Sequence, residues 1–287
     1  MKELVVISGK GGTGKTTITA SFAALAAGQA VLVDADVDAP NLSLITRPQQ
    51  LECHEFRASK KARIVFEKCT SCGLCLQLCR FGAISKEFQV DPISCEGCGV
   101  CSHACPAEAI VMEEVLSGHW FISQTPYGKL VHARLGVAEE NSGKLVTAIR
   151  EKAKIIAANE KKPCLIIDGP PGICCPVIAS LGGVDAALII TEPTLSGIHD
   201  LERVIALCRH FKITVAVCIN RSDLCEDNTR AIENYCRQES IPLAAKIPFD
   251  QTFVEAAAKG LPLVEYRDGP SAKTIEQLWK KMKSILD

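Results

Sequence analysis

The chain has 287 residues, an apolar content of 47% and a formal net charge of −1. That length and composition allow a large core, in one domain or in one domain with a smaller companion. The near-zero charge excludes a global field that would recruit nucleic acid or an anionic membrane, so we expect no nucleic-acid partner and no stable membrane association. The first residues lead directly into a strand-like run and no apolar stretch reaches the length of a membrane span, which favours a cytoplasmic protein.

Cysteine is the unusual component, with 16 residues. In a small secreted chain this number would indicate disulfides, but this chain is large and groups half of its cysteines in two short runs. Metal-binding thiolates in a reducing compartment explain that grouping better than a disulfide framework does.

Short apolar runs rich in β-branched residues recur along the chain, and segments with helical spacing lie between them. The expected strands are residues 4–8, 31–34, 165–168, 187–191, 213–220 and 244–248. Most are apolar throughout, which is typical of parallel strands covered on both faces. The helical spacing of apolar residues also predicts a helix over 141–159. This alternation predicts an α/β fold with a doubly wound, mostly parallel sheet.

The alternation stops after about residue 50 and resumes after about residue 130. Segments 69–84 and 95–110 match in every cysteine, one glycine and the final Ala-Ile, so the interval contains an internal repeat. We therefore predict a large domain formed by 1–52 and 131–287, with a small α+β domain inserted at 53–130. A hairpin that turns at 126–128 should return the chain to the sheet.

The segment SGKGGTGKTT at 8–17 follows an expected strand and opens an expected helix. It fits the pattern G-x-x-x-x-G-K-[ST] of a phosphate-binding loop better than a chance glycine-rich turn or a dinucleotide motif. Glycines let successive backbone N–H groups point into one concavity, Lys15 would bind the β- and γ-phosphates, and Thr16 would bind Mg²⁺. The expected nucleotide-binding residues of the loop are Gly9, Lys10, Gly11, Gly12, Thr13, Gly14, Lys15, Thr16 and Thr17.

A second lysine, Lys10, directly follows Gly9. With this lysine the loop resembles the deviant Walker A ATPases of the MinD/ParA/Mrp group. The resemblance implies a homodimer with ATP at its interface, in which Lys10 reaches the nucleotide of the partner subunit. A solvated loop lysine is the alternative interpretation.

Carboxylates at strand ends extend the resemblance. Asp34, Asp36 and Asp38 end the second expected strand, and ligands bind at such strand ends in open α/β sheets. By resemblance, Asp36 orients the attacking water and contributes to the Mg²⁺ site, with Asp34 beside it. Asp168 in LIIDGPPG (165–172) resembles the Walker B carboxylate of the Mg²⁺ shell. The implied catalytic residues are Lys10, Lys15, Asp34 and Asp36.

Two further segments resemble the part of the family site that binds the base. Asn220 and Arg221 match the adenine-binding position, and IPFD at 247–250, with Pro248 and Asp250, matches the loop that closes over the base. TEPT at 191–194 matches a loop near the γ-phosphate. A strand cap or turn residue is the alternative interpretation of Asn220.

Each cysteine run has the spacing C-x₂-C-x₂-C-x₃-C, which bacterial ferredoxins use for two [4Fe–4S] clusters. In that pattern the fourth cysteine of each run binds the other cluster. The two expected ligand sets are Cys69, Cys72, Cys75 and Cys105, and Cys79, Cys95, Cys98 and Cys101. Zinc is the competing interpretation, although structural zinc usually takes two separated cysteine pairs. The whole chain thus resembles MinD-type ATPases that carry an inserted two-cluster ferredoxin-like domain.

Two other features allow more than one interpretation. Cys174 and Cys175 follow the Walker B segment, where related proteins bridge a cluster between subunits, but adjacent cysteines chelate one metal poorly. We expect them to be buried small residues. The basic, amphipathic segment 274–287 is expected to dock on the sheet rather than bind membrane.

The expected function is a dimeric, Mg²⁺-dependent ATPase that couples ATP binding and hydrolysis to electron transfer by its clusters or to metal-cofactor assembly. Its partner would be a redox or metal-cofactor client protein, for which a paralogous ATPase is one candidate. The expected cofactors are ATP, Mg²⁺ and two [4Fe–4S] clusters. The alternative function is a positioning or scaffold ATPase in which the clusters only stabilise the insertion.

Overall fold

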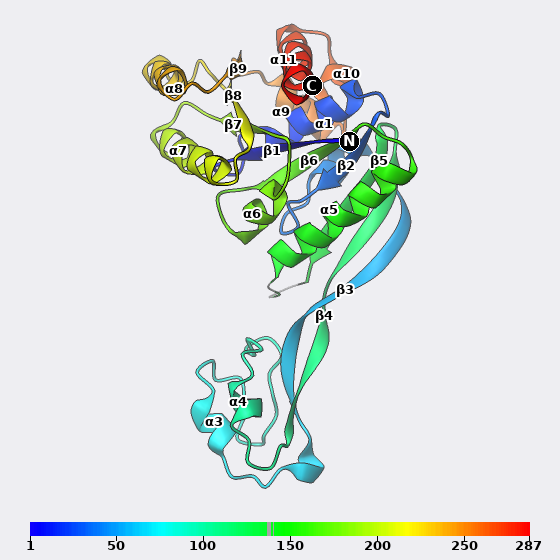
Figure 1. Ribbon diagram of the computed structural model, residues 1–287, viewed down its shortest axis with the longest axis vertical. Helices are drawn as coiled ribbons and strands as arrows, with labels where there is room; N and C mark the ends of the chain where they lie inside the picture. The colour runs from blue at the N-terminus through cyan, green and yellow to red at the C-terminus, as the bar shows by residue number, and fades with distance from the viewer. Residues whose placement is uncertain (137–138, 140) are drawn as a thin grey trace. The chain divides into compact units, whose positions relative to one another are not determined.

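The computed structural model describes residues 1–136, 139 and 141–287. The chain divides into two compact units. The large unit contains Met1–His54, Trp120–Arg134 and Ser142–Asp287, and the small unit contains Glu55–His119 and Leu135–Asn141. Figure 1 shows the ribbon of both units, coloured along the chain.

A mostly parallel sheet forms the centre of the large unit. Within the described residues the sheet order is β3-β4-β5-β2-β6-β1-β7-β8-β9. The strands that lie wholly in or close to the large unit are β1 (Lys2–Ser8), β2 (Ala30–Asp34), β5 (Gly128–Leu135), β6 (Cys164–Pro171), β7 (Ala186–Thr191), β8 (Thr214–Asn220) and β9 (Leu243–Ile247). Every pairing from β5 across to β9 is parallel. The expected strands and the α/β fold are therefore confirmed.

Helices cover both faces of this sheet (Figure 1). The helices of the large unit are α1 (Lys15–Leu25), α2 (Leu42–Thr46), α5 (Ser142–Asn159), α6 (Cys175–Leu181), α7 (Leu195–His210), α8 (Glu226–Gln238), α9 (Thr252–Ala258), α10 (Leu263–Tyr266) and α11 (Pro270–Leu286). Helices α1, α10 and α11 contact one another, and α5 contacts α6. Because both faces are covered, β1 is buried from Leu4 to Ser8 without alternation.

The C-terminal helix α11 packs on the core, as expected. Ile275, Leu278 and Met282 are fully buried in the same cluster as Leu4 of β1. The Trp279 ring lies against Phe22 of α1, with 5.0 Å between the ring centroids. The apolar stripe of this helix is therefore used in packing. Among the described residues, no helix combines the length and the apolar character that crossing a membrane requires.

The small unit has few regular elements. They are η1 (Phe66–Lys68), α3 (Leu74–Leu78) and α4 (Val100–His103), with parts of the long strands β3 (Gln49–Ile64) and β4 (Ile110–Thr125). Gly73 and Gly99, the glycines shared by the two repeat segments, precede α3 and α4 with φ values of 79° and 76°. Since left-handed backbone favours glycine, this explains why the repeat keeps a glycine there.

The sequence predicted the turn before Gly128 but not the strand β3. Most of β3 is exposed, so its sequence lacks the clear period-two pattern of a half-buried strand. The β3 and β4 strands each contain 16 residues, which is long for a globular protein.

Candidate functional site

The loop between β1 and α1 requires glycine at two positions, because a side chain at either would collide with a neighbouring residue. Gly14 precedes α1 with a φ of 85°, and a Cβ there would lie 2.6 Å from Nδ2 of Asn220. A Cβ on Gly9 would lie 2.4 Å from Cβ of Asp200. Both contacts are too close for any other residue, so the backbone of the loop fits closely against its neighbours.

The carboxylate of Asp168 in β6 binds three polar side chains in the first turns of α1. Its carboxylate lies 2.9 Å from Nζ of Lys15 and accepts hydrogen bonds from the hydroxyls of Thr16 (2.7 Å) and Thr19 (3.0 Å). Lys15 and Asp168 are buried, so this ion pair is shielded from solvent. If Lys15 bound a phosphate instead of Asp168, the Thr16 hydroxyl and the Asp168 carboxylate would remain next to each other. Hydroxyl and carboxylate oxygens are the ligands that Mg²⁺ prefers, so these two residues fit that ion.

Two more carboxylates lie at the end of β2. Asp34 is fully buried and accepts backbone hydrogen bonds from Leu42 (3.0 Å) and Asp36 (3.2 Å). Burial, and next the charge of Asp168, raises the pKa of Asp34 well above its usual value. Burial also raises the pKa of Asp36. Asp34 therefore fixes the turn that carries Asp36, whose side chain is partly open to solvent.

A cavity of about 790 Å³ lies above these residues, within the range of pockets that hold a nucleotide-sized ligand. The sequence-predicted residues that line it are Gly11, Gly12, Thr13, Gly14, Lys15, Thr16, Thr17, Asp36, Asn220, Arg221 and Asp250. Gly9, Lys10, Asp34, Asp168 and Pro248 are not in this lining of described residues. The structure thus brings most of the predicted nucleotide site together around one cavity.

The end of the cavity near Asn220 is tied to the phosphate loop. Nδ2 of Asn220 donates to the carbonyl oxygen of Thr13 at 2.8 Å, and Oδ1 accepts from the backbone N–H of Arg221 at 3.0 Å. Exposed apolar side chains also line the cavity there, and the sequence did not single them out: Leu44, Phe249 and Val254. Phe249 could have been identified from the sequence, because it lies between the predicted site residues Pro248 and Asp250.

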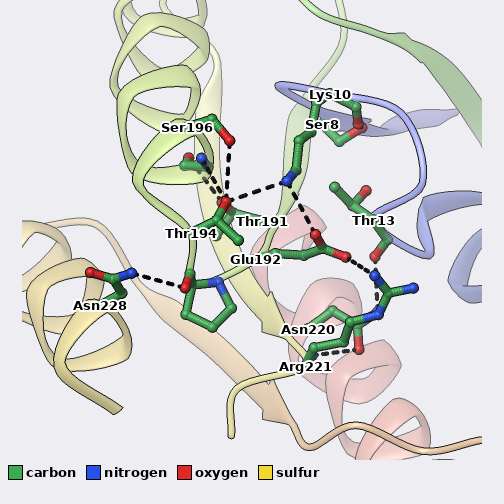
Figure 2. Close-up of polar contacts among 12 residues, drawn as sticks. Ser8, Lys10, Thr13, Thr191, Glu192, Thr194, Ser196, Asn220, Arg221 and Asn228 are labelled. Atoms are coloured by element: carbon green, nitrogen blue, oxygen red, sulfur yellow. Dashed lines mark hydrogen bonds and ion pairs between the residues drawn. The ribbon is translucent and has the colours of Figure 1, made fainter. Parts of the chain in front are cut away.

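Lys10 is paired within its own chain. Its Nζ lies 3.3 Å from Oε2 of the buried Glu192 and donates to the hydroxyl of Thr194 at 3.3 Å. Figure 2 shows these contacts. From the sequence, TEPT at 191–194 was expected near the γ-phosphate, but Glu192 was not singled out. An acidic residue directly after an apolar strand was the signal that could have identified it.

The eight cysteines of the small unit line two separate hollows. The first is lined by Cys69, Cys72, Cys75 and Cys105. The second is lined by Cys79, Cys95, Cys98 and Cys101. In each hollow, three cysteines come from one repeat segment and the fourth from the other. The backbone N–H of Ala109 also donates to Sγ of Cys105 at 3.3 Å.

Each hollow offers a donor set of four cysteine thiolates. Within the described ranges, no group of three or more His, Cys, Asp or Glu side chains converges as ligands of one ion would. Structural zinc needs four ligands that converge at about 2.3 Å for sulfur. In a cubane, each thiolate binds a different iron, so the ligands stand around the cluster. Four thiolates are also the number that one [4Fe–4S] cluster takes, so these residues fit such a cluster.

The cysteines after β6 differ from the expectation. Cys174 and Cys175 are exposed, so the prediction that they are buried is wrong. They lie at the turn into α6, where the chain leaves the sheet, and Cys174 lines the nucleotide-sized cavity. Of the scattered cysteines, Cys208, Cys218 and Cys236 are buried, whereas Cys53 is exposed.

A glycine-rich loop between the first strand and first helix, with carboxylates at the ends of the next parallel strands, defines a P-loop nucleotide-binding protein. The sequence matches the family described as the CobQ/CobB/MinD/ParA nucleotide binding domain over residues 4–263. The chain belongs to this family and is a P-loop ATPase of the MinD/ParA type.

Individual relatives are similar over different shares of the chain. An uncharacterized protein from Methanocaldococcus jannaschii is 32% identical over 286 residues, which cover 99% of this chain and 97% of the relative. The septum site-determining protein MinD from Synechocystis is 26% identical over 91% of this chain and 81% of its own length. An iron-sulfur cluster carrier protein from Pyrococcus horikoshii is 30% identical over 41% of this chain and 44% of its own length.

Solved structures share the fold. MinD from Pyrococcus horikoshii, complexed with Mg-ADP, superposes with a TM-score of 0.63 and 18% identity over 99% of this chain and 96% of its own.

Proposed function

We propose that this protein is a dimeric, Mg²⁺-dependent ATPase whose nucleotide cycle acts on two [4Fe–4S] clusters held by the small unit. The clusters supply low-potential, one-electron chemistry. The cycle would serve electron transfer to a partner protein or metal-cofactor assembly on it. The observation that carries this proposal is the pair of hollows, each lined by three cysteines of one repeat segment and one of the other.

Residues of the large unit have separate tasks in this proposal. Lys15 leaves Asp168 to bind the β- and γ-phosphates, and Thr16 and Asp168 hold Mg²⁺. Asp36 orients the attacking water at the open side of the cavity. Lys10 of one subunit neutralises charge on the phosphoryl group in the other, as added cations do in phosphoryl transfer.

The base end of the site has its own residues. Asn220 and Arg221 would bind the adenine, and Pro248 and Asp250 would hold the loop over it. Asp250 accepts hydrogen bonds from the backbone N–H of Thr252 at 2.9 Å and from the Ser271 hydroxyl. These two bonds support a fixed position for the loop at 247–250.

The small unit, which we propose as a ferredoxin-like insertion, would hold one cluster in each hollow. The first ligand set is Cys69, Cys72, Cys75 and Cys105, and the second is Cys79, Cys95, Cys98 and Cys101. The similarity of part of the chain to an iron-sulfur cluster carrier protein supports a cluster-related role. Hydrogen bonds to sulfur raise cluster potentials, and the Ala109 amide provides one such bond.

Anaerobic purification with iron and sulfide analysis tests this assignment. We expect about eight irons and eight sulfides per chain, from two cubanes of four irons each. Cys72→Ser and Cys98→Ser should each lose about half of the iron, whereas the exposed control Cys53→Ser should keep all of it. Colourless protein that contains zinc, or a control that loses as much iron as the ligand variants, would reject the assignment.

A positioning or scaffold ATPase is the rival function, and the similarity to a septum site-determining protein favours it. The two functions differ in what the clusters do. If the clusters only stabilise the small unit, ATP turnover should be equal with oxidised and reduced protein. If they take part in the cycle, we expect turnover to change on reduction with dithionite.

A further inference from the structure

Glu192 lies at a point where two cations meet. It directly follows β7, and its side chain is only 6% exposed. Lys10 lies 3.3 Å from one carboxylate oxygen, and Nη1 of Arg221 lies 2.7 Å from the other (Figure 2). One buried carboxylate is therefore shared between a lysine of the phosphate loop and an arginine that follows β8.

The backbone around Glu192 is held firmly. Its carbonyl oxygen accepts from the N–H of Thr194 at 2.8 Å, and a Cβ on Gly197 would lie 2.3 Å from that oxygen. The Thr194 hydroxyl accepts from the N–H of Gly197 at 3.0 Å, and Nδ2 of Asn228 donates to the carbonyl oxygen of Pro193 at 3.1 Å. The backbone that carries the carboxylate is thus held in place, whereas Lys10 and Arg221 are long side chains with about a third of their surface exposed.

The two cations come from different loops. Lys10 is in the loop that follows β1, whereas Arg221 lines the cavity next to Asn220, the proposed base-binding residue. Two cations that share one carboxylate repel each other, so each is held less tightly than it would be alone. The strength of the contact between Lys10 and Glu192 therefore depends on Arg221.

We propose that Glu192 is a positioning residue that retains Lys10 within its own subunit, and that Arg221 weakens this retention by sharing the carboxylate. This inference rests on the proposed function, in which Lys10 acts on the nucleotide of the partner subunit. Lys10 must leave Glu192 and Thr194 before it reaches that nucleotide. Glu192 thus opposes the dimeric state, and removal of its charge favours that state.

The reactivity of Lys10 in the nucleotide-free full chain tests the retention directly. An N-hydroxysuccinimide ester of acetate acylates lysines that are deprotonated and accessible, and mass spectrometry gives the rate at each site. We expect Glu192→Gln to raise the rate at Lys10 by at least about threefold, as the loss of a moderate ion pair predicts. The exposed Lys280 serves as the internal reference, and its rate should not change.

Arg221→Gln should act in the opposite direction. With Arg221 gone, Lys10 has the carboxylate to itself, so its acylation should slow. General loosening of the loop would accelerate acylation in both variants. An unchanged rate at Lys10 in Glu192→Gln, or a shift of both variants in the same direction, overturns the proposal.

Sedimentation velocity with a slowly hydrolysed ATP analogue tests the consequence. We expect Glu192→Gln to lower the dimer dissociation constant by about threefold, corresponding to the same ion pair. This gain should vanish when Lys10→Ala is added, because no lysine then remains to be released. A wild-type chain that stays monomeric rejects the dimer of the proposed function, whatever the acylation rates show. A wild-type dimer that Glu192→Gln leaves unchanged or weakens rejects the role of Glu192 alone.

Discussion

The two units of the chain reach order by different means. In the large unit, residues distant in sequence are buried together, and Leu4, Ile18, Leu32 and Ile166 belong to one apolar cluster. Among the described residues of the small unit, one apolar cluster has seven buried members, and two of them are Cys95 and Cys101. Small domains with little apolar core usually need a metal or disulfides to be stable. The large unit should therefore fold from its sequence alone, while the small unit should depend on what its cysteines bind.

Removal of the proposed iron should have the largest effect and should separate the behaviour of the two units. We expect chelation to unfold the small unit and to leave the large unit intact, because binding free energy is folding free energy in such domains. Amide hydrogen exchange measures both units in one sample. Protection should disappear across Glu55–His119 and persist across Ser142–Asp287. If protection were lost equally in both units, or in neither, the proposed difference between the units would be contradicted.

Replacement of the loop lysine should abolish the chemistry of the large unit without affecting the small one. We expect Lys15→Ala to reduce ATP turnover by at least about 100-fold, because the lysine neutralises phosphate charge. The matched control is Lys144→Ala, which removes an exposed lysine from the Ser-Gly-Lys at the start of α5. Steady-state ATPase assays, with iron content measured on the same samples, check both results. Similar losses from both variants would remove the special role of Lys15.

Replacement of Asp36 should give an effect on turnover that depends on pH. We expect Asp36→Asn to lower kcat about 100-fold with little change in KM, as loss of a water-orienting group does. Since burial raises the pKa of Asp36, wild-type turnover should fall with decreasing pH earlier than an ordinary carboxylate would cause. Asp38→Asn, at an exposed residue of the same cavity, is the control and should retain kcat. A similar fall of kcat in both variants would contradict the role of Asp36.

His132 in β5 should link the stability of the large unit to pH. Burial, and next the charge of Arg134, lowers the pKa of His132 from 6.5 to about 4. Between these values the unfolded chain binds more protons, so stability is present above pH 6.5 and is lost as pH falls toward 4. The difference corresponds to about 3 kcal/mol. Urea unfolding should show a flatter pH dependence for His132→Gln, while the exposed control His210→Gln should behave as wild type.

The large unit could be predicted well from the sequence, because strands that are buried on both faces consist almost entirely of apolar residues. Runs such as residues 165–167 are apolar on both faces, and the observed β6 contains them. The strand β3 was missed because an exposed strand such as this leaves little apolar pattern. The partners of Lys10 were missed for another reason. Glu192 is about 180 residues away in sequence, and only the pairing of β1 with β7 brings their ends together.

Cys174 and Cys175 show where a general rule fails. Free cysteine is usually buried, yet these two lie at the exposed turn into α6. Their position after the Walker B segment was a better guide than their residue type. A residue at the end of a strand in an open α/β sheet tends to face the ligand site, and Cys174 lines the cavity.

The most direct test of the central claim is a redox titration of the purified holoprotein, followed by electron paramagnetic resonance, with ADP and with a slowly hydrolysed ATP analogue. If the nucleotide cycle acts on the clusters, at least one of the two midpoint potentials should differ between the two nucleotide states. Identical potentials in both states, in protein that binds both nucleotides and contains its full iron, would contradict the coupling.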